Sequence, residues 1–136
     1  MTAALILILA FADIGSVKAE PDLNKRSELA LENADSAIDT ARKASEAGDE
    51  RTIQAALGEV EESASLCYDS LEQTHATPRK SRYYKRAELK ISALLRRLNS
   101  LRDQVGYETR PAVEAAIKKL SDVHDQLLQE IMSKHK

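Results

Sequence analysis

Two stripes of apolar residues between Tyr84 and Ile131 constrain the fold of this 136-residue chain more than any other feature. Within each stripe the residues recur every three or four positions, which places them all on one face of a helix. A break at Gly106–Pro111 separates the two stripes. The first comprises Tyr84, Ala87, Ile91, Leu94, Leu98, Leu101 and Val105, and the second comprises Val113, Ile117, Leu120, His124, Leu127 and Ile131. The sequence therefore predicts two long helices joined by a short turn.

The preceding residues repeat this arrangement. A helix is expected to begin near Pro21 or Asp22 and to end at Gly48, and Asp49 can cap the next helix. Thr77-Pro78 predicts the start of the third helix. The first two stripes match the last two under a shift of 60 residues, and they comprise Ser27, Leu31, Ala34, Ile38, Ala41 and Ser45, followed by Ile53, Leu57, Val60, Ala64, Cys67 and Leu71.

This pattern predicts an all-α fold, an antiparallel up-down-up-down four-helix bundle built of two helical hairpins, at about 22–73 and 78–134. Spacing near 3.5 residues per turn predicts left-handed packing of the four stripes in six layers. One of these layers would contain Ala34, Ala64, Leu94 and His124. The domain is expected to span residues 20–136.

Residues 1–19 resemble a secretory signal peptide rather than a part of the fold. Ala3 to Ala12 form an unbroken apolar run that is too short to span a bilayer, and Val17-Lys18-Ala19 offers small residues for a signal peptidase. Cleavage would leave Glu20 as the N-terminus, and the mature protein would be periplasmic or secreted and not transmembrane. A buried N-terminal helix that is never removed is the alternative, because the segment before the apolar run lacks Lys and Arg.

The net charge of −2 hides a strong asymmetry. Glu20 to Thr74 contain fourteen acidic and five basic residues (−9), whereas Thr77 to Lys136 contain fourteen basic and seven acidic residues (+7). One interpretation is that two hairpins of opposite charge attract each other. The other is that the second hairpin presents a basic face to an anionic partner.

His124 is the one residue of the four stripes that could bind a cofactor. A buried imidazole needs a hydrogen bond, and bundle cores are where four-helix proteins place cofactors. The two Ala residues in its layer leave room either for a ligand or only for the ring itself. Packing of the ring, with its polar end at a backbone carbonyl, a water or the bundle edge, is the simpler interpretation.

With this inward His in Asp122-Val123-His124-Asp125-Gln126, an exported four-helix bundle of this length resembles the periplasmic b-type cytochromes. The resemblance implies that His124 is one axial haem ligand and that a Met early in the first helix is the other. This chain has no Met between Glu20 and Gly48, Met132 lies on the last helix, and there is no Cys-x-x-Cys-His motif. Haem bound through His124 is therefore the alternative function, and no cofactor is the leading expectation.

Cys67 is the only cysteine, so it cannot form an intramolecular disulfide. Its place on an aliphatic stripe predicts a buried thiol that packs as a small hydrophobic residue. Position 121 is Ser, so the Glu-x-x-His motif of di-metal bundles is absent. No metal site is expected.

The densest basic segment is predicted to bind an anionic partner. Two tyrosines are interleaved with its cations, and the residues assigned to this patch are Arg79, Lys80, Arg82, Tyr83, Lys85 and Arg86. The alternative is that this first helical turn is simply solvated and that Tyr84 continues the apolar stripe. Cations at a helix N-terminus oppose the helix dipole, and this mild conflict keeps the binding interpretation open. Export makes nucleic acid an unexpected partner, and lipid headgroups, phosphorylated glycans or an acidic protein are expected instead. Leu29 and Leu89 fall outside the stripes and could belong to a weak partner surface.

No nucleophile with a base, glycine-rich phosphate loop or paired-carboxylate motif stands out, so catalytic residues are not predicted. The sequence predicts a non-enzymatic binding, scaffold or interaction module, as a monomer or weak dimer. Electron transfer by a haem- or metal-binding bundle that uses His124 is the alternative.

Overall fold

The computed structural model describes residues 14–133, and these form helices with no strand among them. In chain order the elements are α2 (Ile14–Lys18), α3 (Leu23–Ala47), α4 (Glu50–Gln73), η1 (Pro78–Lys80), α5 (Arg82–Gln104) and α6 (Arg110–Met132). The expected all-α fold with four long helices packed together is confirmed. The apolar run at Ala3 to Ala12 lies outside the described residues.

Polar side chains cap the helices of the first hairpin where the sequence predicts. Asp22 accepts a hydrogen bond from the Lys25 backbone N–H at 3.1 Å, and Asp49 accepts one from the Thr52 N–H at 3.2 Å. Gly48 ends α3 with a φ of 73°, a left-handed conformation in which a Cβ would be strained. Each long helix of this hairpin therefore begins at a capping Asp, and Gly48 ends the first of them.

The third long helix starts later than predicted. Thr77-Pro78 begins only the short 3₁₀ helix η1, and α5 begins at Arg82 with Ser81 as its N-cap. The Ser81 hydroxyl accepts hydrogen bonds from the Tyr83 and Tyr84 backbone N–H groups at 3.2 and 3.3 Å. A second hydroxyl cap four residues downstream thus determines the start of the helix.

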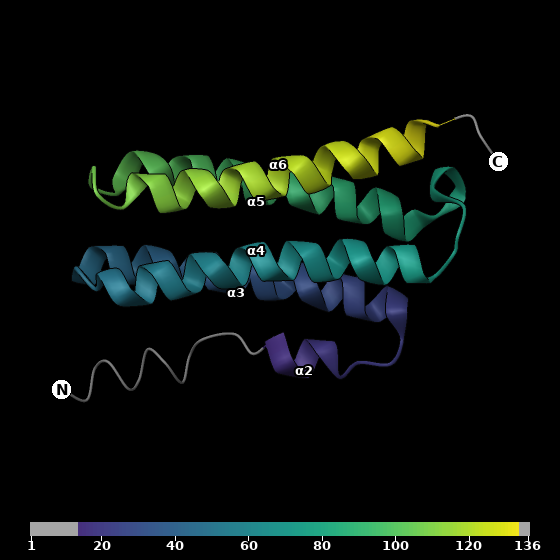
Figure 1. The fold of residues 1–136 in the computed structure, drawn as a ribbon, viewed down its shortest axis with the longest axis horizontal. Helices are drawn as coiled ribbons and strands as arrows, with labels where there is room; N and C mark the ends of the chain where they lie inside the picture. Colours follow the sequence, from purple (N-terminus) through teal and green to yellow (C-terminus); the bar gives the residue numbers. More distant parts are fainter. Residues whose placement is uncertain (1–13, 134–136) are drawn as a thin grey trace.

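The two hairpins lie one above the other in Figure 1. Helix α3 lies beside α4, α5 lies beside α6, and contacts of α3 with α5 and of α4 with α6 join the two pairs. The α3–α4 pair is the closest because small residues fill its interface. Seven alanines of this pair are fully buried: Ala30, Ala34, Ala37, Ala41, Ala44, Ala56 and Ala64. Small side chains allow two helix backbones to approach each other.

The predicted core layers are buried with few exceptions. The residues of these layers that are only half-buried are Ser45, Ile117, His124 and Ile131. On α6 the buried positions are instead Ala116 and Val123, each one residue before the predicted one. The buried positions Val113, Ala116, Leu120, Val123 and Leu127 alternate steps of three and four residues, which is the 3.5-residue repeat of helices that pack along one seam. The prediction that His124 belongs to a core layer with Ala34 and Ala64 is wrong.

Helix α2 covers part of the first hairpin, although it lies within the predicted signal segment. Val17 is buried against the bundle, the Ile14 backbone N–H donates to Glu59 Oε2 at 3.2 Å, and Lys18 Nζ forms an ion pair with Glu62 Oε2 at 2.7 Å. Residues 14–18 therefore contribute contacts to this fold. Within residues 14–133, no helix has the length and apolar character needed to cross a membrane.

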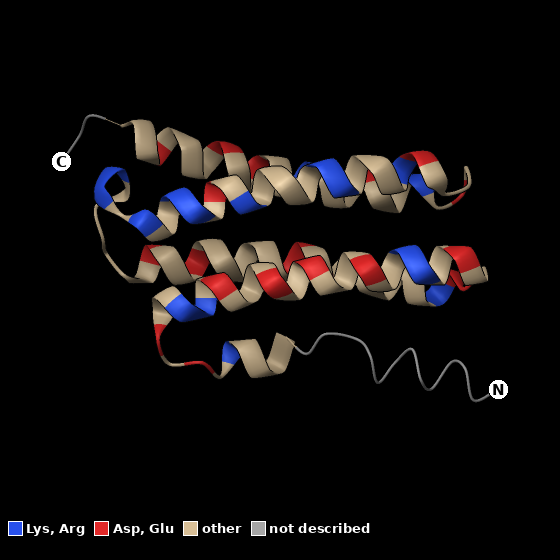
Figure 2. Ribbon diagram, turned by 180° about the vertical axis from the view of Figure 1, so that it is seen from behind, with Lys and Arg blue, Asp and Glu red and all other residues tan. Residues whose placement is uncertain are grey.

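Ion pairs connect the acidic first hairpin to the basic second one. Arg86 Nη1 lies 2.8 Å from Glu28 Oε2, and Lys90 Nζ lies 3.2 Å from Asp35 Oδ2. Arg97 bridges Asp35 and Asp39. Figure 2 shows these basic turns of α5 above the acidic turns of α3. The interpretation that opposite charges attract the hairpins is confirmed at these positions.

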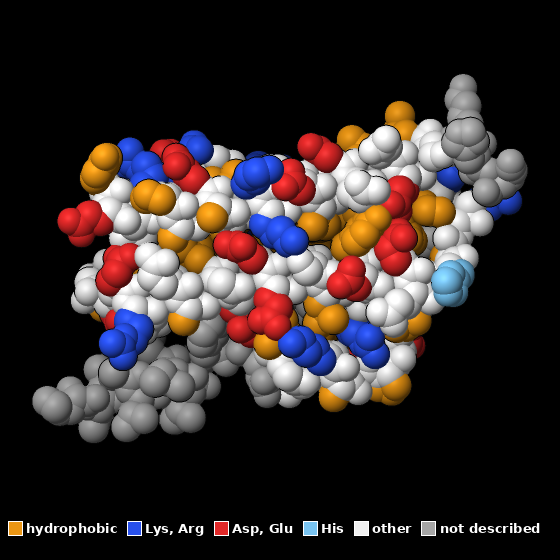
Figure 3. Space-filling view, viewed as in Figure 1, with side chains coloured by type: hydrophobic (Ala, Val, Ile, Leu, Met, Phe, Trp, Pro, Cys, Tyr) orange, Lys and Arg blue, Asp and Glu red, His pale blue; other side chains and the backbone are white. Residues whose placement is uncertain are grey.

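The opposite view, in Figure 3, shows a mixed surface. Acidic and basic side chains are interspersed over it, and hydrophobic side chains are visible between the two hairpins. The concentration of unpaired positive charge is instead at one end of the molecule, where η1 leads into α5.

Candidate functional site

The predicted anion-binding patch lies on two consecutive elements. Arg79 and Lys80 belong to η1, and the other members belong to the first turns of α5. All five cations are exposed, and Tyr83 is half-buried. Of these cations only Arg86 forms an ion pair with a carboxylate of the described residues, Glu28. The others remain available to a partner's anionic groups.

Two arginines enclose the ring of Tyr83. The guanidinium carbon of Arg82 lies 5.1 Å from the ring centroid, and that of Arg86 lies 5.6 Å from it. Arg82 Nη2 also donates to the Tyr83 hydroxyl at 3.1 Å. Cation–π contacts of this length hold the guanidinium groups in place while leaving N–H donors for other acceptors. Tyr83 thus orders the two cations of the patch that flank it.

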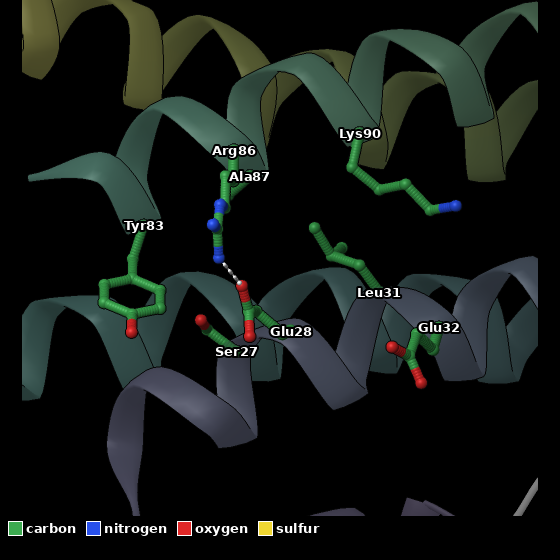
Figure 4. Close-up of a pocket in the computed structure, with 8 residues that line it drawn as sticks. All are labelled: Ser27, Glu28, Leu31, Glu32, Tyr83, Arg86, Ala87 and Lys90. Atoms are coloured by element: carbon green, nitrogen blue, oxygen red, sulfur yellow. Dashed lines mark hydrogen bonds and ion pairs between the residues drawn. The ribbon is translucent and has the colours of Figure 1, made fainter.

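A groove of about 300 Å³ opens between α3 and α5 beside this cluster. Figure 4 shows Tyr83 and Arg86 reaching from α5 towards α3, where the Arg86–Glu28 ion pair crosses the groove near Leu31. A second groove of about 360 Å³ uses Tyr83, Arg82 and Lys80 as part of its wall. Tyr83 therefore contributes to both grooves. The first also contains Glu28 and Glu32, whereas the second has Lys80 and Arg82 next to the aromatic ring with no carboxylate in its wall, so the second suits an anionic group.

His124 lies between α5 and α6 rather than in the centre of the bundle. Its Nε2 is 2.7 Å from Glu88 Oε2 and 3.0 Å from Ser92 Oγ, and its Nδ1 is 3.5 Å from Asp125 Oδ1. The side chain is 18% exposed. Packing with a hydrogen bond is thus the interpretation that the geometry supports, with side chains in place of the expected backbone carbonyl or water.

This geometry does not fit an axial haem ligand. Both of the short contacts of His124 are made by Nε2, so coordination through that atom would displace Glu88 and Ser92. Met132 is exposed and lies two turns further along the same helix, where it cannot face His124 across the core. Across residues 14–133, no three His, Cys, Asp or Glu side chains are grouped to hold a metal ion. The role of His124 in cofactor binding stays an untested prediction.

Cys67 has the environment that its position predicts. Its side chain is fully buried and free, and burial raises the pKa of the thiol to about 12. A thiol with so high a pKa is a poor nucleophile and a poor metal ligand. Cys67 and His124 both lie in the bundle without forming a site together.

The sequence analysis missed a polar cluster that joins the hairpins at the end opposite the Gly48 turn. The Tyr68 hydroxyl donates to Glu130 Oε2, the Tyr84 hydroxyl donates to Glu72 Oε2 at 3.1 Å, and Gln126 Nε2 donates to Glu130 Oε2 at 3.0 Å. The carboxyl groups of Glu72 and Glu130 are near enough for each to shift the pKa of the other. Two carboxylates therefore meet where α4, α5 and α6 converge.

The two carboxyl groups of this cluster are perturbed in opposite directions. Partial desolvation, followed by the neighbouring Glu130, raises the pKa of Glu72. Desolvation also acts to raise the pKa of Glu130, but hydrogen bonds from Tyr68 and Gln126 outweigh it and hold that pKa below its ordinary value. Burial and the charge of Glu72 raise the pKa of Tyr84, so this hydroxyl stays a donor. The only sign of this cluster in the sequence is Tyr84 on an apolar stripe, because a buried hydroxyl needs a hydrogen-bond acceptor.

Comparison with known proteins gives no match: no family model fits the chain, and no curated protein or solved structure is detectably similar to it. Function is therefore argued from the residues of this chain alone.

Proposed function

We propose that this protein is an exported, antiparallel up-down-up-down four-helix bundle that acts as a non-enzymatic binding module. Its binding surface would be the basic patch at η1 and the start of α5, and its partner would carry anionic groups. The observation that carries the proposal is the unequal pairing of positive charge along η1 and α5. Lys90 and Arg97 in the middle of α5 form ion pairs with α3, whereas Arg79, Lys80, Arg82 and Lys85 have no carboxylate partner among the described residues.

The position of these cations supports the proposal physically. Arg82, Lys85 and Arg86 lie in the first turns of α5, where the helix dipole is positive and opposes them by a few tenths of a kcal/mol each. Each further unpaired cation at the same end adds to the repulsion. An anionic partner would relieve this repulsion, and long-range attraction would also speed its association.

Retention on immobilised heparin, used as a polyanion, tests this function. We expect the variant Arg79→Gln, Lys80→Gln, Arg82→Gln, Lys85→Gln to elute at markedly lower salt than the unchanged protein. The control removes the same charge elsewhere in the second hairpin, through Arg96→Gln, Arg110→Gln, Lys118→Gln, Lys119→Gln. Equal elution of both variants would show that only net charge matters and would refute the proposal.

The haem-binding alternative is separated from this function by a visible spectrum. Titration of the protein with haem would favour the alternative if it gave a shifted Soret band that His124→Ala abolished. Unchanged spectra for both proteins would leave the binding module as the function to pursue.

A further inference from the structure

An exposed stripe on α5 combines cations with an apolar side chain. Arg82, Lys85 and Leu89 are spaced three and four residues apart, so they share one face of the helix. All three are exposed, and Leu89 is 66% exposed. This face points away from the core stripe that contains Tyr84 and Ile91.

Helix α6 presents a second exposed apolar pair on the same side of the molecule. Leu128 and Met132 are four residues apart and are 39% and 70% exposed. At the upper edge of Figure 3, over the later turns of α6, hydrophobic side chains protrude from the surface. These are large apolar groups that no described part of the chain covers.

The contact of His124 with Glu88 fixes how the two stripes are aligned. His124 Nε2 lies 2.7 Å from Glu88 Oε2, and α6 runs back alongside α5. Leu128 is one turn beyond His124 on α6, and Lys85 is one turn before Glu88 on α5. Helical geometry therefore brings Leu128 to the level of Lys85, with Leu89 and Met132 on either side.

The combined surface lies outside the two grooves described beside Tyr83, because neither has Leu89, Leu128 or Met132 in its wall. A helical partner is held in an apolar groove, and these exposed apolar residues belong to neither groove. A lipid bilayer needs no groove, because single apolar side chains can enter its interface while neighbouring Lys and Arg contact the phosphates. Asp125 is the exposed carboxylate nearest to these residues along α6, and the cations outnumber it.

We propose that the outer face of the α5–α6 hairpin docks on the surface of an anionic lipid bilayer. Arg82 and Lys85 contact lipid phosphates, and Leu89, Leu128 and Met132 insert into the interface. Juxtaposed basic charge and inserted apolar groups are the two signals that stable peripheral binding requires. The proposal rests on the proposed function, since Arg82 and Lys85 belong to the basic patch, and it adds the class of partner.

Co-sedimentation of the full chain with phosphatidylglycerol-containing vesicles tests this surface, with pure phosphatidylcholine vesicles as the reference. We expect binding to the anionic vesicles only. The variant Leu89→Ser, Leu128→Ser, Met132→Ser should lose vesicle affinity by about tenfold or more, the order expected for losing the burial of one Leu-sized group. Because these side chains are exposed, the variant should keep its helical circular dichroism and its retention on heparin. Tyr107→Ser changes an 87% exposed residue at the opposite end and should bind as the unchanged protein does.

Two results would overturn the membrane proposal while leaving the proposed function intact. The first is retention on heparin without any sedimentation with anionic vesicles, which would point to a protein or glycan partner. The second is unchanged vesicle affinity of the triple Ser variant, which would mean that charge alone attracts the protein. If the unchanged protein is not retained on heparin at physiological salt, the proposed function itself is refuted.

Discussion

Single residues in this protein are perturbed most where the two hairpins meet. Glu72 and Glu130 come from α4 and α6, and hydrogen bonds from Tyr68 and Gln126 make Glu130 the more easily ionised of the two carboxyl groups. A carboxyl that accepts more hydrogen bonds is stabilised as the anion, and its neighbour is then more easily protonated. The cluster therefore makes stability depend on pH at the end of the bundle that also carries the basic patch.

The variant Glu72→Gln should become more stable relative to the unchanged protein as the pH rises. The folded pKa of Glu72 is raised above its ordinary value near 4.5, so its contribution is present below that pH and is lost as the pH rises through the raised value. Gln stays neutral and avoids this loss. Because Glu72 is largely exposed, we expect a change of only about 0.5–1 kcal/mol. Urea unfolding at a series of pH values measures it.

Glu130→Gln provides the matched comparison, because the pKa of Glu130 is lowered. Its contribution is present above the ordinary value near 4.5 and is lost as the pH falls through the lowered folded value. The Glu130 variant should therefore lose stability relative to the unchanged protein at neutral pH. If the stability of both variants relative to the unchanged protein changed in the same direction with pH, the opposite directions assigned to the two pKa shifts would be contradicted.

Cys67 should be unreactive in the folded protein. Its thiol is fully buried with a pKa near 12, so only a trace of thiolate forms at neutral pH and reagents cannot reach it. Colour development with a disulfide reagent should be slow in buffer and complete after unfolding in urea. Since Cys67 is the only cysteine, the signal has one source. Fast reaction of the folded protein would contradict the burial.

At the scale of the helices, apolar packing and ion pairs join different pairs of helices. Alanines bring α3 and α4 close together, while ion pairs connect α3 to α5 along the edge. Burial of apolar surface supplies most of the stabilisation, and partly exposed ion pairs add little individually. Arg97 is the exception, because it bridges two carboxylates in a network.

Replacement of Arg97 by Gln should lower the free energy of unfolding by about 1 kcal/mol, the value of a networked pair that is still partly solvated. It leaves Asp35 and Asp39 without the cation that both share, although Lys90 still pairs with Asp35. The loss should shrink at high salt because screening weakens the original attraction. Arg96→Gln, at the exposed neighbouring position, should change stability by less than about 0.5 kcal/mol. Equal effects of the two variants would show that the bridge contributes nothing specific.

The whole molecule includes a segment that the sequence assigns to a signal peptide. Removal of α2 should leave the bundle folded but less stable by about 1–2 kcal/mol, the value of burying one Val-sized side chain. Val17 supplies that burial. Urea unfolding of chains that begin at Ile14 and at Glu20 measures the difference. Loss of cooperative unfolding in the shorter chain would mean that α2 is integral to the fold.

The basic patch and the Glu72–Glu130 cluster lie at the same end of the bundle, where α4 connects to α5. The groove lined by His75, Arg79 and Glu130 joins them. An anionic partner at the patch would therefore approach this pair of carboxyl groups. The charge of the two carboxyl groups thus contributes to the electrostatics of the binding surface.

The sequence by itself determined the four long helices, most of the buried stripes, the buried state of Cys67 and the extent of the basic segment. Each of these follows from local periodicity, a cap or a cluster of charge that neighbours in the chain define. The exposed cations needed no tertiary information, because a helix with one buried stripe must display the rest.

Tertiary structure alone decided which polar side chains meet. The partners of His124 Nε2 lie on another helix, and Tyr68 is 62 positions from Glu130. On α6 the core contains Val123 in place of the adjacent His124. Rotation by one residue changes which side chain faces the core, and only the packing of the four helices against one another fixes that rotation.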